Sequence, residues 1–259
     1  METVNRVAFI RGALESAGAD GVVFANSGGK DCVLVGILCK KACDNTVGLI
    51  LPCGTKRNYE SDLSDAKAVS EQYDIAARII DLARVKNEFI AAIGGGSSTA
   101  GATPTIVGAT PPAGDATPLS ANAAANIAAR LRMIALYSVS VSENRLVAGT
   151  GNRSERYMGY FTKWGDGAYD FNPIADLTVT EIYEFLRYLG APAFVIDKAP
   201  SAGLYEGQTD EADMGVTYRS IDDFLLNGVT NDRDMAIIER YHKASGHKRT
   251  MPPMYREAN

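Results

Sequence analysis

The chain has 259 residues, of which 46% are hydrophobic, and a net charge of −5, so it can form one large α/β domain or two small ones. No basic run is longer than Lys248-Arg249 and no apolar stretch reaches about 18 residues, so we expect no nucleic-acid partner and no membrane partner. Met1–Val4 lacks a basic region followed by an apolar one, which predicts no secretory signal and a cytoplasmic protein.

The four cysteines lie early in the chain, at Cys32, Cys39, Cys43 and Cys53, and do not resemble a secreted disulfide framework. The first three share one face of a predicted helix, so a metal or cluster site is conceivable. Small buried thiols on the core-facing side of that helix are the simpler interpretation. With only two histidines in the chain, we expect no His-based metal site.

Hydrophobic periodicity in the first third of the chain alternates between strand and helix patterns. This order predicts an α/β fold with a parallel, doubly wound sheet and flanking helices. The predicted elements are a helix over 3–17, a strand at Gly21–Ala25, a helix over 30–43, a strand over 46–51, a helix over 62–73 and a strand over 74–81.

Residues 93–120 interrupt this pattern with Gly, Ser and Thr-Pro steps that could form little core. Such a segment is either a disordered insertion or a lid that orders over substrate or against a partner subunit. We predict a single domain over 1–259 with a flexible insertion at 93–120. The elements predicted after it are a helix over 121–138, a strand over 144–149 and helices over Ile174–Leu189, 219–227 and 231–243.

The run Ser27-Gly28-Gly29-Lys30-Asp31-Cys32 joins a predicted strand to a predicted helix. Its glycines let the backbone approach a ligand, and the free N–H groups at a helix start favour an anion. Asp31 would repel a bare phosphate unless Mg²⁺ lies between the two. The run therefore predicts a magnesium polyphosphate site at the carboxyl end of a strand, although glycines in such a turn can also serve tight packing alone.

The same run resembles the S-G-G-x-D-S loop of N-type ATP pyrophosphatases, with Cys32 in place of the last serine. Later segments resemble NAD synthetases, in that family's order and over nearly the whole chain. They are 126–133 (N-I-A-A-R-L-R-M), 146–155 (L-V-A-G-T-G-N-R-S-E), 159–170 (G-Y-F-T-K-W-G-D-G-A-Y-D), Pro200-Ser201-Ala202, 208–211 (Q-T-D-E) and His247-Lys248-Arg249. The resemblance implies a Rossmann-like fold of the adenine nucleotide alpha hydrolase type.

The resemblance also implies site residues. Asp31 and Glu155 would hold Mg²⁺ and, with Lys30, act in catalysis. Taken singly, Glu155 could instead be a solvated first-turn glutamate favoured by a helix dipole, and Arg130 and Lys163 could be surface charges. The residues implied for ATP are Ser27, Gly28, Gly29, Lys30, Asp31, Cys32, Thr150 and Ser201, and those for deamido-NAD are Arg130, Lys163, Asp170, His247 and Lys248. Tyr137 and Phe161 could stack on a ligand ring but are more typical of core positions, so they stay outside the predicted site.

The activity implied is that of an ammonia-dependent NAD synthetase. The nicotinate carboxylate of deamido-NAD is adenylated by Mg·ATP, and ammonia then displaces AMP. Use of ammonia is expected because no residues remain for a glutaminase domain, and a homodimer with helices near 121–137 at its interface is implied by the family. No covalent nucleophile is required, so Cys32 is not predicted to be one.

Two alternatives stay open. One is another ATP pyrophosphatase that amidates or thiolates a different acid. The other is a nucleotide-binding relative weakened at Cys32 and at Val179, where the family often has a lysine that touches the ATP phosphates. Lys30 or Thr180 could partly replace that lysine.

Overall fold

The computed structural model describes residues 1–94, 119–198, 200–201, 207 and 209–255. Most of the predicted insertion, 95–118, lies outside the described residues. No described helix is long and apolar enough to cross a membrane.

The centre of the molecule is a sheet of four parallel strands in the order β3-β2-β1-β4. The strands are β1 (Gly21–Ala25), β2 (Thr46–Ile50), β3 (Ala76–Ile79) and β4 (Arg145–Ala148). The chain winds outward from β1 to β3 and then returns to place β4 on the other side of β1. This confirms the predicted doubly wound sheet, and its switch point lies between β1 and β4, where ligands of such sheets bind.

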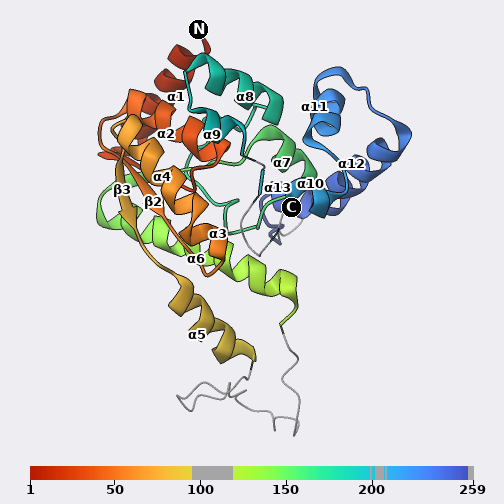
Figure 1. The fold of residues 1–259 in the computed structure, drawn as a ribbon, viewed down its shortest axis with the longest axis horizontal. Helices are drawn as coiled ribbons and strands as arrows, with labels where there is room; N and C mark the ends of the chain where they lie inside the picture. Colours follow the sequence, from red (N-terminus) through yellow and green to blue (C-terminus); the bar gives the residue numbers. More distant parts are fainter. Residues whose placement is uncertain (95–118, 199, 202–206, 208, 256–259) are drawn as a thin grey trace, which may run out of the picture.

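The two faces of the sheet are buried by different helices, because successive side chains of a strand point to opposite faces. Val22 and Phe24 of β1 pack in one apolar cluster with α1 (Glu2–Ala17), α2 (Lys30–Ala42) and α8 (Val179–Tyr188). Val23, between them, packs in a second cluster with α6 (Ala121–Ser142). Figure 1 shows α6 crossing one side of the sheet, with α5 (Ala83–Gly94) extending away from the body beside it.

A smaller apolar cluster forms beside the sheet. It joins α7 (Arg153–Met158), α11 (Tyr218–Asn227) and α12 (Asp232–Ala244) to the start of α8, and its buried members include Met158, Val179 and Ile221. In Figure 1, α11 and α12 form a lobe at the side of the body. The remaining long helix is α4 (Ser61–Gln72). Four described helices are short: α3 (Lys56–Tyr59), α9 (Ala193–Ile196), α10 (Asp210–Met214) and α13 (Gly246–Arg249).

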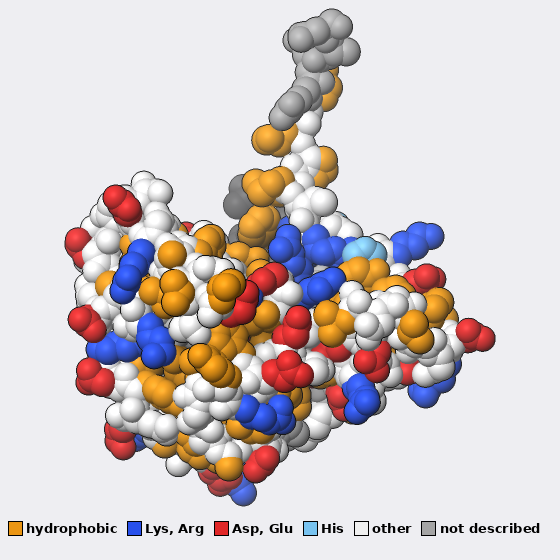
Figure 2. Space-filling view, turned by 90° about the horizontal axis from the view of Figure 1, so that it is seen from above, with side chains coloured by type: hydrophobic (Ala, Val, Ile, Leu, Met, Phe, Trp, Pro, Cys, Tyr) orange, Lys and Arg blue, Asp and Glu red, His pale blue; other side chains and the backbone are white. Residues whose placement is uncertain are grey.

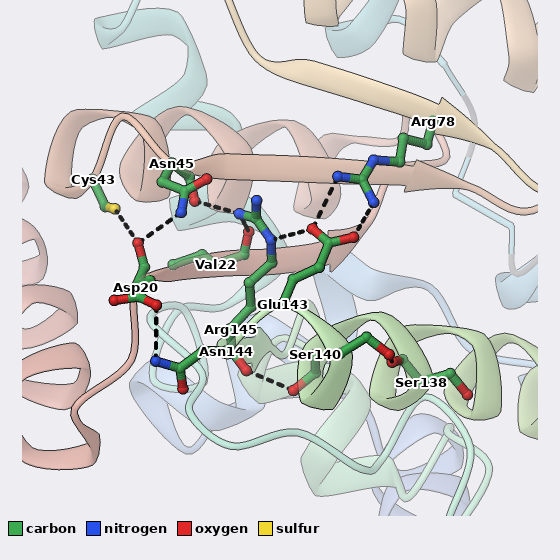
Figure 3. Close-up of polar contacts among 11 residues, drawn as sticks. Asp20, Val22, Cys43, Asn45, Arg78, Ser138, Ser140, Glu143, Asn144 and Arg145 are labelled. Carbon is green, nitrogen blue, oxygen red and sulfur yellow. Dashed lines mark hydrogen bonds and ion pairs between the residues drawn. The ribbon is translucent and has the colours of Figure 1, made fainter.

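A polar network links β3 to the start of β4 and to the residue that precedes β2 (Figure 3). Glu143 lies between two arginines, accepting hydrogen bonds from Arg78 on β3 and from Arg145 Nε at 2.9 Å. Arg145 also donates to the Asn45 carbonyl at 2.7 Å. The Glu143 carboxylate thereby connects β3 with β4 across the sheet.

Several predicted boundaries need correction. The helix predicted over Ile174–Leu189 begins only at Val179, because the side chain of Thr178 caps it by accepting from the Glu181 N–H. Six described helices were not predicted: α5, α7 and the very short α3, α9, α10 and α13. The four cysteines are free thiols, and Cys43 lies just after the end of α2.

Candidate active site

The turn after β1 is held by its own side chains and by α4. The Gly28 N–H donates to Asn26 Oδ1 at 3.1 Å, and Asn26 Nδ2 in turn donates to Ser70 Oγ of α4 at 3.0 Å. Gly28 has a φ of +68°, and a Cβ there would lie 2.5 Å from that of Asp65. Glycine is therefore required both by the left-handed backbone and by the close approach of α4.

The first turn of α2 carries two charged side chains into the site. Lys30 Nζ lies 2.8 Å from Asp31 Oδ2, and both side chains are largely buried. The other oxygen of Asp31 accepts from the side-chain amide of Asn152 at 3.2 Å. Asp31 is thus fixed between an ammonium from its own helix and an amide from the turn after β4.

Asn152 brings the second carboxylate to the same place. It caps α7, and its backbone N–H donates to Glu155 Oε2 at 3.0 Å while its side chain accepts from the Glu155 N–H. Glu155 therefore does help to cap the start of α7. The same carboxylate also lines the cavity described below, so it is not merely a solvated end of a helix.

Asp31 and Glu155, called the carboxylate pair below, influence each other. Burial, and next the charge of Asp31, raise the pKa of Glu155 well above its ordinary value, with Lys30 acting in the opposite direction. Although burial disfavours a charged ammonium, Asp31 and Glu155 together raise the pKa of Lys30. Lys30 is therefore a permanent cation beside two carboxylates.

The carboxylate pair fits a magnesium ion that is shared with a substrate. Mg²⁺ is usually held by one or two carboxylates together with substrate phosphates and water. Among the described residues there is no group of three or more Asp, Glu, His or Cys side chains arranged for a metal. A metal held by the carboxylate pair would have two ligands from these side chains and would need others, such as oxygens of a nucleotide phosphate or water.

Cys32, in the last position of the turn, has a protonated thiol. Its Sγ lies 3.3 Å from Ser27 Oγ, and burial raises the pKa of the thiol against the opposing effect of the Ser27 hydroxyl. A thiol with a raised pKa is a poor nucleophile. Its position suits a weak hydrogen-bond donor to an anion.

A cavity of about 1010 Å³ lies at the carboxyl ends of β1, β2 and β4. It is at the upper end of the range of about 300–1,000 Å³ common for small-molecule sites, and so has room for a large ligand or for two. The residues predicted for ATP, magnesium and deamido-NAD that line it are Ser27, Gly29, Lys30, Asp31, Cys32, Thr150, Glu155, Ser201 and Lys248.

Three residues predicted for deamido-NAD form a chain of contacts near the cavity without lining it. Arg130 of α6 donates to the Lys163 carbonyl at 3.4 Å, and Lys163 Nζ donates to the His247 carbonyl at 2.7 Å. Lys248, which does line the cavity, donates to the carbonyls of Gly159 and Phe161, each at 2.7 Å. The predicted cations thus gather on one side.

Asp170 lies apart from these cations. One of its oxygens accepts from the Val147 N–H at 2.7 Å and the other from the Tyr137 hydroxyl at 3.2 Å. Tyr137 and Arg130 are seven residues apart on α6, which places them on one helix face about two turns apart. Of the two aromatics kept out of the predicted site, Tyr137 therefore orients a predicted site residue and Phe161 lines the cavity.

Sequence reasoning missed a second charged cluster on the cavity wall. Lys198 Nζ lies 2.9 Å from Asp62 and 2.7 Å from Asp65, both on α4. Arg57 also pairs with Asp62, at 3.1 Å. Lys198 precedes Ser201 by three residues, so its ion pairs hold the segment near Ser201 against α4, the helix that packs against Gly28. In the sequence, only this proximity to Ser201 could have indicated that Lys198 belongs to the site.

The start of α8 does not offer the cation that the family often has there. Val179 is buried in the third apolar cluster. Thr180 donates from both its N–H and its hydroxyl to Asp222, each at 2.7 Å, and is engaged away from the turn. Of the two side chains considered as replacements, Lys30 is the one that reaches the cavity.

Acidic and basic described side chains are interspersed over the face shown in Figure 2, rather than gathered in one basic field. This distribution suits a site with local charges better than a surface that follows a nucleic-acid backbone.

The comparisons with known proteins agree with this geometry. The sequence profile of the NAD synthase family matches residues 2–252. An NH(3)-dependent NAD(+) synthetase of Carboxydothermus hydrogenoformans is 39% identical over 252 residues, covering 97% of this chain and 95% of that protein. Among solved structures, NMN synthetase from Francisella tularensis has a TM-score of 0.85 at 33% identity, with 98% of this chain and 97% of that one covered. The NH3-dependent NAD synthetase from Campylobacter jejuni has a TM-score of 0.74 at 27% identity, with 98% and 97% covered.

Proposed function

Because the chain belongs to the NAD synthase family, we propose that it amidates the nicotinate carboxylate of deamido-NAD with ammonia, at the expense of ATP. The observation that carries the proposal is the carboxylate pair. Its members follow two neighbouring strands, are linked through Asn152 and line one cavity beside the Gly28-Gly29 turn. This is an arrangement for a polyphosphate with a divalent cation.

The proposed reaction has two steps. An oxygen of the nicotinate carboxylate attacks the α-phosphorus of ATP, and the bond to the β-phosphate oxygen breaks, which releases pyrophosphate. Ammonia then attacks the carboxyl carbon of the adenylate, the bond to AMP breaks, and the nitrogen loses a proton to give the amide. The products are NAD, AMP and pyrophosphate.

The side chains of this site act by binding and positioning. Ser27, Thr150 and Ser201 line the cavity and could donate to nucleotide oxygens, and the free N–H groups at the start of α2 face an anion. Mg²⁺, held by the carboxylate pair, would neutralise the developing pyrophosphate charge. Lys30 supplies a further positive charge at the same place.

We assign the acid substrate to the side of the cavity near Lys248. Arg130, Lys163 and His247 are connected there by hydrogen bonds, and cationic side chains suit the carboxylate and pyrophosphate of a dinucleotide. Asp170, oriented by Tyr137, would accept from a ribose hydroxyl or receive the incoming amine.

The test is turnover by the purified protein. We expect NAD, AMP and pyrophosphate in equal amounts from deamido-NAD, ATP, Mg²⁺ and ammonium, and pyrophosphate release that requires the acid substrate. ATP binding with no pyrophosphate release from any acid would mean a nucleotide-binding relative without this activity. Glu155→Gln should abolish turnover while leaving the fold intact, since an amide can still accept the Asn152 N–H.

A second candidate substrate is nicotinate mononucleotide. The supporting observation is the similarity to the Francisella tularensis protein, whose name says that it makes NMN. The bond formed and the ATP chemistry would be the same, but the acid would lack the adenylate half. Comparing kcat/KM for the two acids under identical conditions decides between them.

A homodimer is the proposed assembly, and the cytoplasm the proposed location. Val85, Phe89 and Ile93 form an exposed apolar stripe along α5, and Ile134 and Val141 are exposed on α6, against which α5 packs. Figure 1 shows α5 projecting from the body. Exposed apolar residues that share a helix face, as on α5, suit an association surface. Light scattering should give twice the chain mass, and Phe89→Glu should reduce it to one chain.

A further inference from the structure

Lys30 is a deeply buried charged side chain of the site. It is 6% exposed, although lysine is rarely buried without a partner. Its Nζ contacts Asp31 Oδ2 at 2.8 Å and lies 5.4 Å from the centre of the Tyr218 ring. Tyr218 in turn donates its hydroxyl to Asp210 at 3.0 Å. The ammonium is thus surrounded by groups that favour a cation.

Such contacts already engage both oxygens of Asp31 and one oxygen of Glu155. Asp31 Oδ2 accepts from Lys30, and Asp31 Oδ1 accepts from Asn152. Glu155 Oε2 accepts from the Asn152 backbone. A divalent cation that enters between the carboxylates must therefore approach an ammonium that already neutralises one of them, and two cations at such a distance repel each other.

A polyphosphate changes this balance. It brings several negative charges to the start of α2 and gives the ammonium a second place to bind. The lysine stem is flexible and its ammonium is a point charge that can change partners. Lys30 is the first residue of the helix whose N–H groups would face the anion, so phosphates bound there would lie within reach of its stem.

We propose that Lys30 is an internal counter-ion that competes with the divalent cation for Asp31, so that the carboxylate pair accepts magnesium together with the nucleotide and not before it. Lys30 is then a positioning residue in the free enzyme and a phosphate ligand in the complex. The inference rests on the proposed use of Mg·ATP, but the experiment below does not require amidation.

The experiment measures binding of Mn²⁺ to the full chain by electron paramagnetic resonance, without nucleotide and then with the α,β-methylene analogue of ATP, which cannot be cleaved at the reacting bond. The key variant is Lys30→Met, with Lys30→Gln as a second neutral variant. The matched control is Lys40→Met, which removes another lysine of α2 paired with aspartates, outside the cavity.

We expect Lys30→Met to bind Mn²⁺ at least tenfold more tightly than wild type without nucleotide, and to bind the analogue more weakly when the metal is present. Lys40→Met should change neither affinity. Unchanged or weaker Mn²⁺ binding in both neutral Lys30 variants, with melting temperatures near that of wild type, would overturn the proposal. If the wild type itself bound no analogue, the proposed function would fail, which is a different result.

Discussion

Gly28 allows a direct measurement of how closely α4 packs against the Ser27–Cys32 turn. In Gly28→Ala, the new Cβ would lie 2.5 Å from Asp65 Cβ and 2.7 Å from the Ala66 nitrogen. It would also occupy a backbone with φ +68°. The left-handed backbone costs about 1–2 kcal/mol for a residue with a side chain. Overpacking against backbone and a Cβ that cannot rotate away adds about 1–3 kcal/mol.

The expected loss in the free energy of unfolding is therefore about 2–5 kcal/mol, a large part of the stability of an ordinary domain. Gly18→Ala is the control, because Gly18 has a φ of +61° and nothing within 4 Å of an added Cβ. It should lose about 1–2 kcal/mol. Urea unfolding followed by circular dichroism gives both values. Equal losses in the two variants would refute the packing argument, since only Gly28 has a neighbour to displace.

Three further predictions concern side-chain contacts. Glu143→Gln should lower the free energy of unfolding at pH 7 by about 1–2 kcal/mol, discounted because the carboxylate is partly exposed. Its hydrogen bonds, first from Arg78 and then from Arg145, lower the pKa of Glu143 to about 2. The gap in unfolding free energy between wild type and variant should therefore narrow in urea titrations as the pH falls from about 4.3 toward 2. A gap as large at pH 2 as at pH 7 would contradict this. Cys32→Ser should raise kcat/KM for ATP by about three- to tenfold, because a hydroxyl donates better than a thiol; a decrease would mean that the thiol is preferred. Asn152→Ala should cost about 1–2 kcal/mol of stability through the lost cap and also raise the Mg²⁺ concentration needed for half-maximal turnover; a stability loss without that increase would limit this residue to capping.

The strands were predictable because the residues that indicate each strand are neighbours in the sequence. Gly21–Ala25 and the apolar run after Thr46 are short, and turn signals bound them, so the periodicity alone identifies β1 and β2. The same local reasoning could have corrected the start of one helix and identified another that was missed. Thr178 and Glu181 form a capping box, the pattern that starts a helix, and so do Asn152 and Glu155 at the start of α7. The predicted helix over Ile174–Leu189 ran through the first of these signals.

Helix α5 shows a different limit. Val85, Phe89 and Ile93 recur every four residues, a helical pattern that sequence reasoning passed over beside the Gly-rich break. In the structure all three are exposed, so the stripe does not mark the core of this chain. Periodicity predicts which side chains share a face, and only the packing of the whole molecule decides what that face meets.

The charged contacts of the site lie beyond local patterns. Lys198 is more than 130 residues from Asp65, and neither position shows in its own surroundings that the other is its partner. The turn that contains Lys30 was identified from sequence, but the direction of its ammonium was not. That direction follows from Tyr218 and from the two carboxylates, which the fold brings from three different elements. From sequence, Lys30 at the start of α2 is predicted only to bind phosphate. In the structure its ammonium is buried against Asp31, which is a second partner. Sequence therefore pointed to Lys30 and Asp31 at the carboxyl end of β1, and the structure adds the contact between them, from which we infer that metal and nucleotide enter together.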